Sequence, residues 1–307
     1  MIEVAIMIEG QNGLTWPHWK RIAKIAEDGG FAGLYRSDHF TNDGPPELDS
    51  LDCWVSLTWL ASHTQRIEFG PLVSPVSFRD PRMLARQAAQ IDDLSGGRLR
   101  LGVGAGWNRY EHRMFGYDLL DTSARFERFQ EGLEIITRLL KDTHPVTFNG
   151  RYYQLKDAVL LPRPSRPGGP PIVIGGSGPK RTLPLVVRYA DEWNCVYQTP
   201  ENFQRLNAML DEMLREAGRE PGSVRRTMMT GLAFGRTRQE IEARLRGTSP
   251  EQARQRGMIA GTAGEVIDQL NHLGSLGLQR VMLQWLDLEN LDLLEEFGKA
   301  VVEKVQA

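Results

Sequence analysis

Among the residues able to carry acid–base chemistry, His39 has the most informative position. It is the histidine, of six in the chain, that directly follows a predicted strand beside an acid, Asp38. Imidazole titrates near neutral pH, so a histidine here is suited to hydrogen-bond or protonate a bound ring. The alternative interpretation is a buried histidine whose nitrogens bond the backbone.

Two glycine-rich segments also follow predicted strands. The first alternates Gly-x-Gly-x-Gly from Gly102 to Gly106 and leads into Trp107 and Asn108. Its spacing differs from the dinucleotide fingerprint GxGxxG, which disfavours a dinucleotide-binding fold. Glycines here would let a flat ring approach the backbone. Small residues that fill a tapering barrel interior are an equal alternative.

The second glycine segment is Gly175-Gly176-Ser177-Gly178, followed by Pro179-Lys180-Arg181-Thr182. It leads into the N-terminus of a helix, where free backbone N–H groups and the positive end of the helix dipole favour a phosphate. The spacing is not that of a Walker motif. We expect a phosphate at this segment, and a tight turn without a ligand is the alternative.

The sequence predicts no metal site. The other histidines form no HExxH-type pair,. Cys53 and Cys195 lie far apart without CxxC spacing, which is too little for a disulfide framework or a structural zinc site,. We expect both cysteines to be buried small apolar residues.

An alternation of strands and helices along almost the whole chain must position these residues. Short β-branched apolar runs are followed by amphipathic stretches, the pattern of parallel βαβ units. The expected strands are 4–8, 33–37, 67–73, 99–103, 171–174, 191–195, 227–234 and 280–284. The expected helices include 16–28, 52–62, 81–94, 125–140, 203–217 and 265–276.

Eight strands favour an α/β fold of the (β/α)8 TIM-barrel type, with residues 1–307 as a single domain,. A doubly wound open sheet is the alternative, because local periodicity does not show whether a parallel sheet closes. Residues 147–155, with Asn149-Gly150 at the turn, are typical of an inserted β-hairpin,. The charged segment 236–256 is expected to be a helical excursion beside the barrel mouth,.

The composition argues against several classes of partner. A net charge of −2 with 41% hydrophobic and 25% charged residues offers no general attraction for nucleic acid or an anionic membrane,. The apolar stretches are shorter than the ~20 residues that span a bilayer, and residues 1–10 lack a basic leader region,. We therefore expect a cytoplasmic protein with a small-molecule substrate.

The motifs follow one another in a characteristic order. They are Ser37-Asp38-His39-Phe40, Gly70-Pro71-Leu72-Val73-Ser74-Pro75 with Arg79 and Pro81, Leu94-Ser95-Gly96-Gly97-Arg98, Gly104-Ala105-Gly106-Trp107-Asn108 with Glu111, Pro171 to Gly178, and Ala190-Asp191. In this order, and over essentially the whole chain, they resemble the bacterial luciferase-like monooxygenase family. The resemblance is to its coenzyme F420-dependent branch in particular.

The resemblance implies a barrel that binds coenzyme F420, or alternatively flavin mononucleotide (FMN), at the strand C-termini. A non-prolyl cis peptide would lie behind the ring, at Pro71-Leu72 or Leu72-Val73. His39 would be the catalytic residue. The cofactor-binding residues implied are Asp38, Leu72, Val73, Ser74, Gly106, Trp107, Asn108, Gly175, Gly176, Ser177 and Gly178.

The same resemblance orders the possible functions. The resemblance favours an F420-dependent oxidoreductase that transfers hydride. The alternative is an FMN-dependent two-component monooxygenase, and a non-catalytic flavin-binding subunit is the least favoured function. The family's glucose-6-phosphate dehydrogenases have a tryptophan shortly after Asp-His-Phe and an acid directly after the glycine run, where this chain has Asp43 and Trp107. We therefore expect a different substrate. A homodimer is expected by family analogy alone.

Overall fold

A computed structural model describes residues 1–305 of the chain. Its parallel strands are β1 (Glu3–Ile8), β2 (Gly33–Arg36), β3 (Glu68–Pro71), β4 (Ser74–Pro75), β5 (Leu101–Gly104), β8 (Ile172–Gly175), β9 (Glu192–Val196), β10 (Arg225–Phe234) and β12 (Arg280–Gln284). Neighbouring strands run in the order β3-β2-β1-β12-β10-β9-β8-β5-β4. Because β3 and β4 are successive parts of one strand, this order corresponds to the eight positions of a TIM barrel,.

The barrel is closed between its third and fourth positions. The Phe69 N–H donates to the Arg98 carbonyl at 3.1 Å, and the Phe69 carbonyl accepts from the Arg100 N–H at 2.8 Å. Ser74 and Pro75 continue this contact by pairing with Val103 and Gly104. The predicted barrel is therefore confirmed, and the open sheet is excluded.

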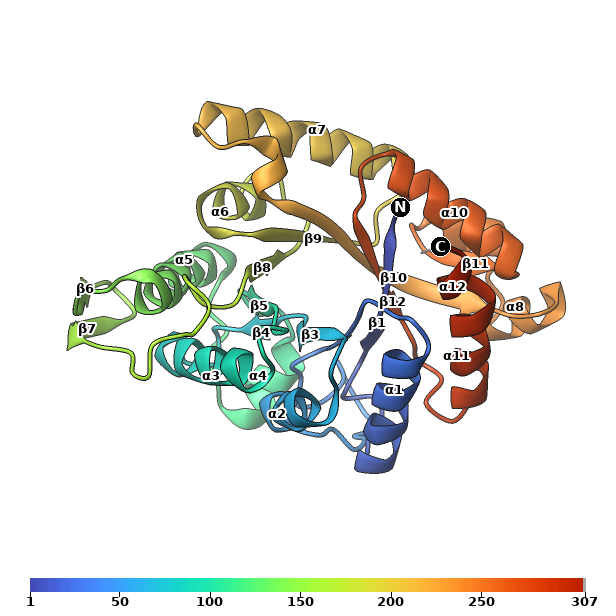
Figure 1. The fold of residues 1–307 in the computed structure, drawn as a ribbon, viewed down its shortest axis with the longest axis horizontal. Helices are drawn as coiled ribbons and strands as arrows, with labels where there is room; N and C mark the ends of the chain where they lie inside the picture. Colours follow the sequence, from blue (N-terminus) through green and yellow to red (C-terminus); the bar gives the residue numbers. More distant parts are fainter. Residues whose placement is uncertain (306–307) are drawn as a thin grey trace.

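Helices cover the outside of the barrel (Figure 1). They are α1 (Trp16–Asp28), α2 (Cys53–His63), α3 (Pro81–Leu94), α4 (Arg109–Phe115), α5 (Thr122–Lys141), α6 (Thr182–Tyr189), α7 (Pro200–Glu216), α10 (Ala263–Ser275), α11 (Leu291–Phe297) and α12 (Glu303–Val305), with shorter turns at Pro221–Ser223 and Gly298–Val302. Side chains such as Asp52, Asp80 and Asp121 cap first-turn N–H groups and fix where helices begin,. Within residues 1–305, no helix combines the length and apolarity needed to cross a membrane.

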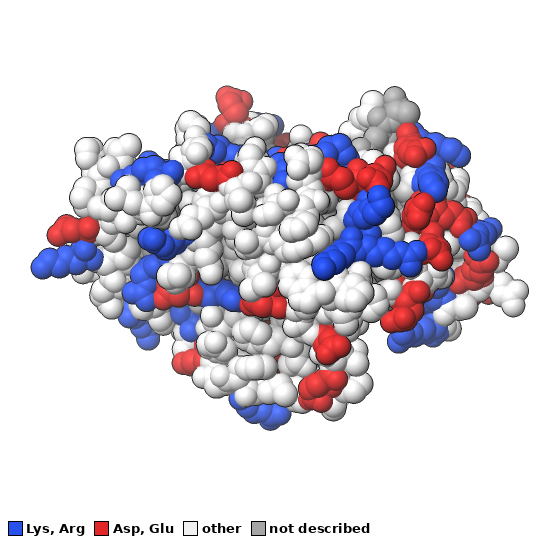
Figure 2. All heavy atoms as spheres, turned by 60° about the horizontal axis from the view of Figure 1, so that its bottom comes forward, with Lys and Arg blue, Asp and Glu red and all other residues white. Residues whose placement is uncertain are grey.

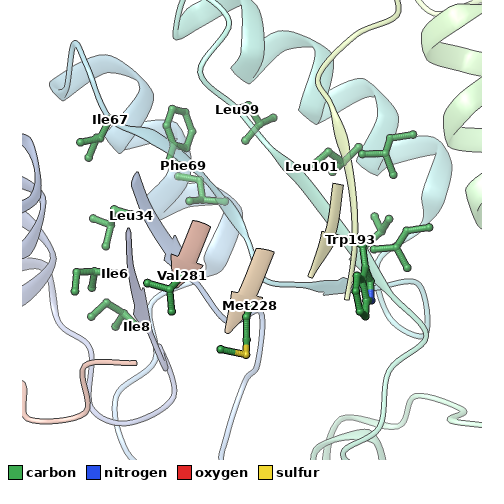
Figure 3. Packing of buried hydrophobic residues seen from close by; sticks show 14 of the residues in the cluster. Ile6, Ile8, Leu34, Ile67, Phe69, Leu99, Leu101, Trp193, Met228 and Val281 are labelled. Atoms are coloured by element: carbon green, nitrogen blue, oxygen red, sulfur yellow. The ribbon is translucent and has the colours of Figure 1, made fainter. Parts of the chain in front are cut away.

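The main apolar core lies between the strands and the surrounding helices. Alternate strand residues point outward into it, among them Ile6, Leu34, Phe69, Leu101 and Val281 (Figure 3). Both cysteines are buried, as predicted. Because the intervening strand residues point into the barrel, their types determine what the interior can hold.

The interior of the barrel has an apolar middle and an ionic floor. Arg280, almost fully buried at the N-terminal end, places Nη2 2.5 Å from Glu3 and 2.6 Å from Glu68. The middle layer is formed by Ala5, Met7, Tyr35, Leu72, Val173 and Met282. With the floor closed in this way, a ligand reaches the barrel from the C-terminal ends of its strands.

A cis peptide bond between Leu72 and Val73 separates β3 from β4. It lies at one of the two bonds that the family resemblance indicated, whereas the sequence alone predicted one unbroken strand over 67–73. The side chain of Val73 lies against three glycines. A Cβ added at Gly102, Gly104 or Gly175 would come within 3.1, 2.5 or 3.2 Å of a Val73 methyl group. These glycines therefore make room for Val73 in the barrel centre.

The predicted hairpin is present as antiparallel β6 (Val146–Asn149) and β7 (Gln154–Ala158), which project from the barrel at the left of Figure 1. Its turn spans 150–153, not the pair Asn149-Gly150 alone. The Glu131 carboxylate accepts hydrogen bonds from the N–H groups of Arg151, Tyr152 and Tyr153, which stabilises the longer turn.

The predicted charged excursion contains α8 (Arg238–Arg244) and α9 (Pro250–Gln255). A strand that the sequence did not predict, β11 (Ile259–Gly261), follows and pairs with the end of β10. A small apolar cluster that includes Ala233, Ile241 and Ala253 holds the excursion against the barrel. Acidic and basic residues are interspersed over one face of the molecule (Figure 2), in keeping with the small net charge.

Candidate active site

The C-terminal end of the barrel brings His39 and Glu111 together. The imidazole Nδ1 lies 2.8 Å from Glu111 Oε1, and the second carboxylate oxygen accepts from the Phe40 N–H at 3.0 Å. Glu111 is 0% exposed, whereas His39 retains 14% side-chain exposure. Among the described residues, the other ring nitrogen, Nε2, has no hydrogen-bond partner. This arrangement orients His39 with one nitrogen free for a ligand.

Asn108 determines where Glu111 stands. It is the N-cap of α4, and its side-chain oxygen accepts from the N–H groups of Tyr110 at 2.9 Å and Glu111 at 3.2 Å. Asn108 is itself buried. The predicted pocket residue Asn108 therefore holds the helix that carries the carboxylate, and its contact with a cofactor stays a prediction.

Glu111 also controls the charge of His39. Burial favours the neutral imidazole, but the hydrogen bond and negative charge of Glu111, aided by Glu9 and Asp38, outweigh burial and raise the pKa of His39,. The basicity of His39 thus depends mainly on the buried carboxylate of Glu111. The predicted site residue Trp107 packs edge-to-face on His39, with ring centroids 5.5 Å apart, and is 59% exposed at the mouth.

Asp38 and Ser74, both predicted to bind the cofactor, lie together beneath the mouth. The Asp38 carboxylate accepts from Ser74 Oγ at 2.6 Å and from Arg79 Nε and Nη2 at 3.0 and 2.7 Å. Trp54 Nε1 donates to Ser74 Oγ at 2.9 Å. Asp38 is only 2% exposed. In this structure the pair joins β2 to β4, and a direct contact with a cofactor stays a prediction.

The glycine segment 175–178 lies at the same end of the barrel and leads into α6. Gly176 has a φ of 122°, a conformation that residues with side chains rarely adopt,. The carbonyl of Gly178 accepts from the N–H groups of Thr182 and Leu183. Within residues 1–305, no hydrogen bond uses the backbone N–H groups of Ser177, Gly178, Lys180 or Arg181. These free donors at a helix N-terminus can hold a phosphate.

The remaining predicted residues line the centre and rim of the mouth. Leu72 and Val73 form an apolar surface over the barrel centre. Gly106 has a φ of 86°, and a Cβ there would lie 2.3 Å from Ser77 Oγ. Gly106 thus permits the close turn that delivers Trp107 beside His39. Contact of these residues with a ring stays a prediction.

Sequence reasoning missed several residues at this end of the barrel. Arg79 appears in the sequence only as part of a family landmark, yet it is the counter-ion of Asp38 and Asp52. Glu111 served only as a family landmark, because nothing local indicates its contact with His39. No sequence motif marks Tyr197 and Gln284, which follow β9 and end β12. Their position after parallel strands is the signal that would have found them.

Two hollows accompany the site. A cavity of about 190 Å³ lies beside the β2 loop and is lined by Asp38, His39, Phe40, Cys53 and Phe115, among others. A larger hollow of about 480 Å³ lies outside the barrel between α2 and α3. The smaller one adjoins the titratable groups, so it is the one that belongs to the candidate site.

A family model described as luciferase-like monooxygenase matches residues 3–276. The chain therefore belongs to the luciferase-like monooxygenase family.

Two curated relatives are informative. The F420-dependent glucose-6-phosphate dehydrogenase of Kineococcus radiotolerans is 31% identical over 212 residues, which are 68% of this chain and 61% of the relative. The 4-hydroxyprotoasukamycin monooxygenase of Streptomyces nodosus subsp. asukaensis is 33% identical over 156 residues, 51% of this chain and 40% of the relative. The matched part is thus less than two thirds of either relative.

Among solved structures, an F420-dependent secondary alcohol dehydrogenase in complex with an F420-acetone adduct superposes with a TM-score of 0.84. The superposition covers 98% of this chain and 99% of that chain, at 20% sequence identity. At this identity the likeness supports the barrel fold alone.

Proposed function

We propose that the protein is an oxidoreductase that transfers hydride between coenzyme F420 and a small organic substrate. The observation that carries the proposal is the presence, at one barrel end, of both a carboxylate-supported histidine and a glycine segment with free N–H donors. The F420-dependent relative supports the choice of cofactor. A hydride transfer needs an oriented donor and acceptor and a nearby proton carrier.

The residues present suit such a cofactor. Ser177, Gly178, Lys180 and Arg181 offer backbone donors for its phosphate, and the neighbouring Lys180 and Arg181 add positive charge,. The apolar surface of Leu72 and Val73 suits a flat ring. When bound, the deazaflavin would supply the carbon that accepts or gives up the hydride.

His39 would handle the proton. An alcohol that loses a hydride from carbon also loses a proton from oxygen, and the carbonyl product results. The free Nε2 of His39 accepts that proton, while Glu111 stabilises the resulting imidazolium through Nδ1,. In the opposite direction the same nitrogen returns the proton.

An FMN-dependent monooxygenase is the second candidate, favoured by the monooxygenase among the relatives. Separate titrations of the protein with coenzyme F420 and with FMN, followed by fluorescence, distinguish the two. We expect tight binding of the deazaflavin. Tight binding of FMN without binding of the deazaflavin would transfer the proposal to the monooxygenase.

The expected homodimer and cytoplasmic location are part of the same proposal. The outer face of α2 and α3 exposes Val55, Met83 and Leu94, of which Val55 and Leu94 line the 480 Å³ hollow,. An apolar face of this kind suits a second copy of the chain. Sedimentation velocity of wild type and Val55→Asp tests the dimer: wild type is expected to sediment as a dimer and the variant as a monomer. Cell fractionation tests the location.

A further inference from the structure

Three side chains from different strands form a hydrogen-bonded chain along one side of the barrel mouth. Tyr197 Oη donates to Gln284 Oε1, and Gln284 Nε2 donates to Glu9 Oε1. Gln11 Nε2 donates to the other Glu9 oxygen at 2.9 Å. We call Glu9, Gln11, Tyr197 and Gln284 the polar arc. None of them exchanges a hydride or a proton in the transfers described above, and Glu9 acts on His39 only through its charge.

The backbone conformation of Tyr197 and the space at Gly231 together determine where the phenol of Tyr197 lies. Tyr197 has a φ of 50°, in the left-handed region that residues other than glycine seldom adopt,. Its phenol passes over β10, where Gly231 leaves room: a Cβ on Gly231 would lie 2.9 Å from Tyr197 Oη. Gly231 pairs with Gln284 in β12, so the missing side chain lets the phenol reach the amide. The phenol oxygen is thereby directed to the mouth.

The arc retains hydrogen-bonding capacity after these internal bonds. Tyr197 Oη uses its hydrogen on Gln284 and keeps its lone pairs, and the Glu9 oxygens have further acceptor sites,. The side-chain amides of Gln11 and Gln284 each use one N–H in this chain and have a second,. A hydroxyl group, which both donates and accepts, complements such a surface.

The charged groups near the arc further restrict the chemical class of the ligand. The charged groups with the largest effect on His39 are the carboxylates of Glu111, Glu9 and Asp38, and Glu9 is the charged group that acts on Tyr197. Arg79, the nearby guanidinium, is paired with Asp38 and Asp52. An anionic substrate group would meet uncompensated negative charge here. A hydrocarbon would bury the arc's polar groups without partners.

We infer that the polar arc is the substrate-recognition surface and that it selects a multiply hydroxylated substrate without an anionic group over phosphorylated and mono-hydroxylated ones. The inference rests on the proposed function, since it assumes that the cofactor occupies the side of Val73 and the glycine segment. Tyr197 is then the specificity-determining residue. The inferred substrate thus differs from the sugar phosphate that the name of the F420-dependent relative contains.

The test uses alcohols that share a six-membered ring, on the protein loaded with coenzyme F420. Glucose, cyclohexanol and glucose 6-phosphate are compared by reduction of the cofactor and by ligand-observed NMR binding. Glucose is expected to exceed each of the others by about tenfold, the effect of one well-placed hydrogen bond. Highest binding and turnover of glucose 6-phosphate or cyclohexanol, or no binding of glucose, would overturn the inference.

Tyr197→Phe is expected to reduce the preference for glucose over cyclohexanol about tenfold and to leave the affinity for the cofactor unchanged. Tyr152→Phe, which removes a hydroxyl on the hairpin turn, is the matched control. An unchanged preference in Tyr197→Phe would exclude the specificity role. Failure of wild type to bind the cofactor would instead contradict the proposed function, so the two failures are distinguishable.

Discussion

Glu111 follows His39 by 72 residues in the chain and places a fully buried carboxylate oxygen 2.8 Å from its Nδ1. Glu111 stands there because α4 begins at the N-cap Asn108. His39 stands there because β2 ends at Arg36. Two independent elements therefore create one acid–base unit at the barrel mouth.

Replacement of Glu111 by Gln should move the pH dependence of the reaction. The amide keeps the size of the side chain but removes the charge that raises the pKa of His39. The limb of the kcat/KM profile governed by His39 should therefore move to lower pH, whichever direction of hydride transfer is measured. Glu127→Gln on the protein surface is the control. An unmoved limb would mean that Glu111 does not act on His39.

Removal of the imidazole should stop proton transfer without releasing the cofactor. His39→Ala is expected to lower kcat by roughly 100-fold or more, the usual contribution of a positioned acid or base. The affinity for coenzyme F420 should change little. His63→Ala, on the exposed end of α2, serves for comparison. Turnover of His39→Ala within about threefold of wild type would rule out the role given to His39.

One negative charge introduced into the glycine segment tests the proposed phosphate site. In Gly178→Asp a carboxylate stands beside the free N–H groups of Ser177 and Gly178, so the dissociation constant for coenzyme F420 should rise at least about tenfold. Affinity for a deazariboflavin without phosphate should be unaffected. Gly222→Asp, at a glycine with open space around it, is the matched control. Equal losses for both ligands would point to general misfolding of the loop.

The ion pairs of the ionic floor should make the free energy of unfolding depend on pH. Burial opposes ionisation of Glu68, but Arg100 and Arg280 lower its pKa from 4.5 to about 2. A carboxyl with a depressed pKa stabilises the fold above its unfolded pKa and loses this effect as pH falls toward the folded value. Glu68→Gln should therefore reduce the free energy of unfolding by about 3 kcal/mol at pH 7.

The loss in Glu68→Gln should fade between pH 4.5 and about 2, where wild-type Glu68 itself becomes protonated. Urea unfolding across this range measures it. Lys24→Gln, which breaks an exposed pair on α1, should leave the midpoint unchanged at every pH. A constant difference between Glu68→Gln and wild type across the range would refute the electrostatic explanation.

The barrel was predictable because each strand and helix has its own local periodicity. The local sequence of residues 33–37 and of residues 280–284 predicts a strand without any information about neighbouring strands. His39 comes shortly after the first of these strands in the chain. Strand three was different. The break at Leu72–Val73 has no periodic signal, so family resemblance alone indicated it.

The connections within the site were much less predictable. The contacts of Arg79 with Asp38 and of Glu111 with His39 join residues 41 and 72 positions apart, and they exist only because strand ends meet. Tyr197 was missed for another reason. The position of its phenol depends on the space at Gly231 in a different strand, which no local pattern encodes.

A crystal structure of the protein with bound coenzyme F420 tests the central claim most directly. The account predicts the phosphate within about 3 Å of the N–H groups of Ser177 and Gly178, the ring against Leu72–Val73, and Nε2 of His39 facing the ring. A cofactor bound elsewhere, for example in the hollow between α2 and α3, or a ring beyond the reach of His39, would contradict it.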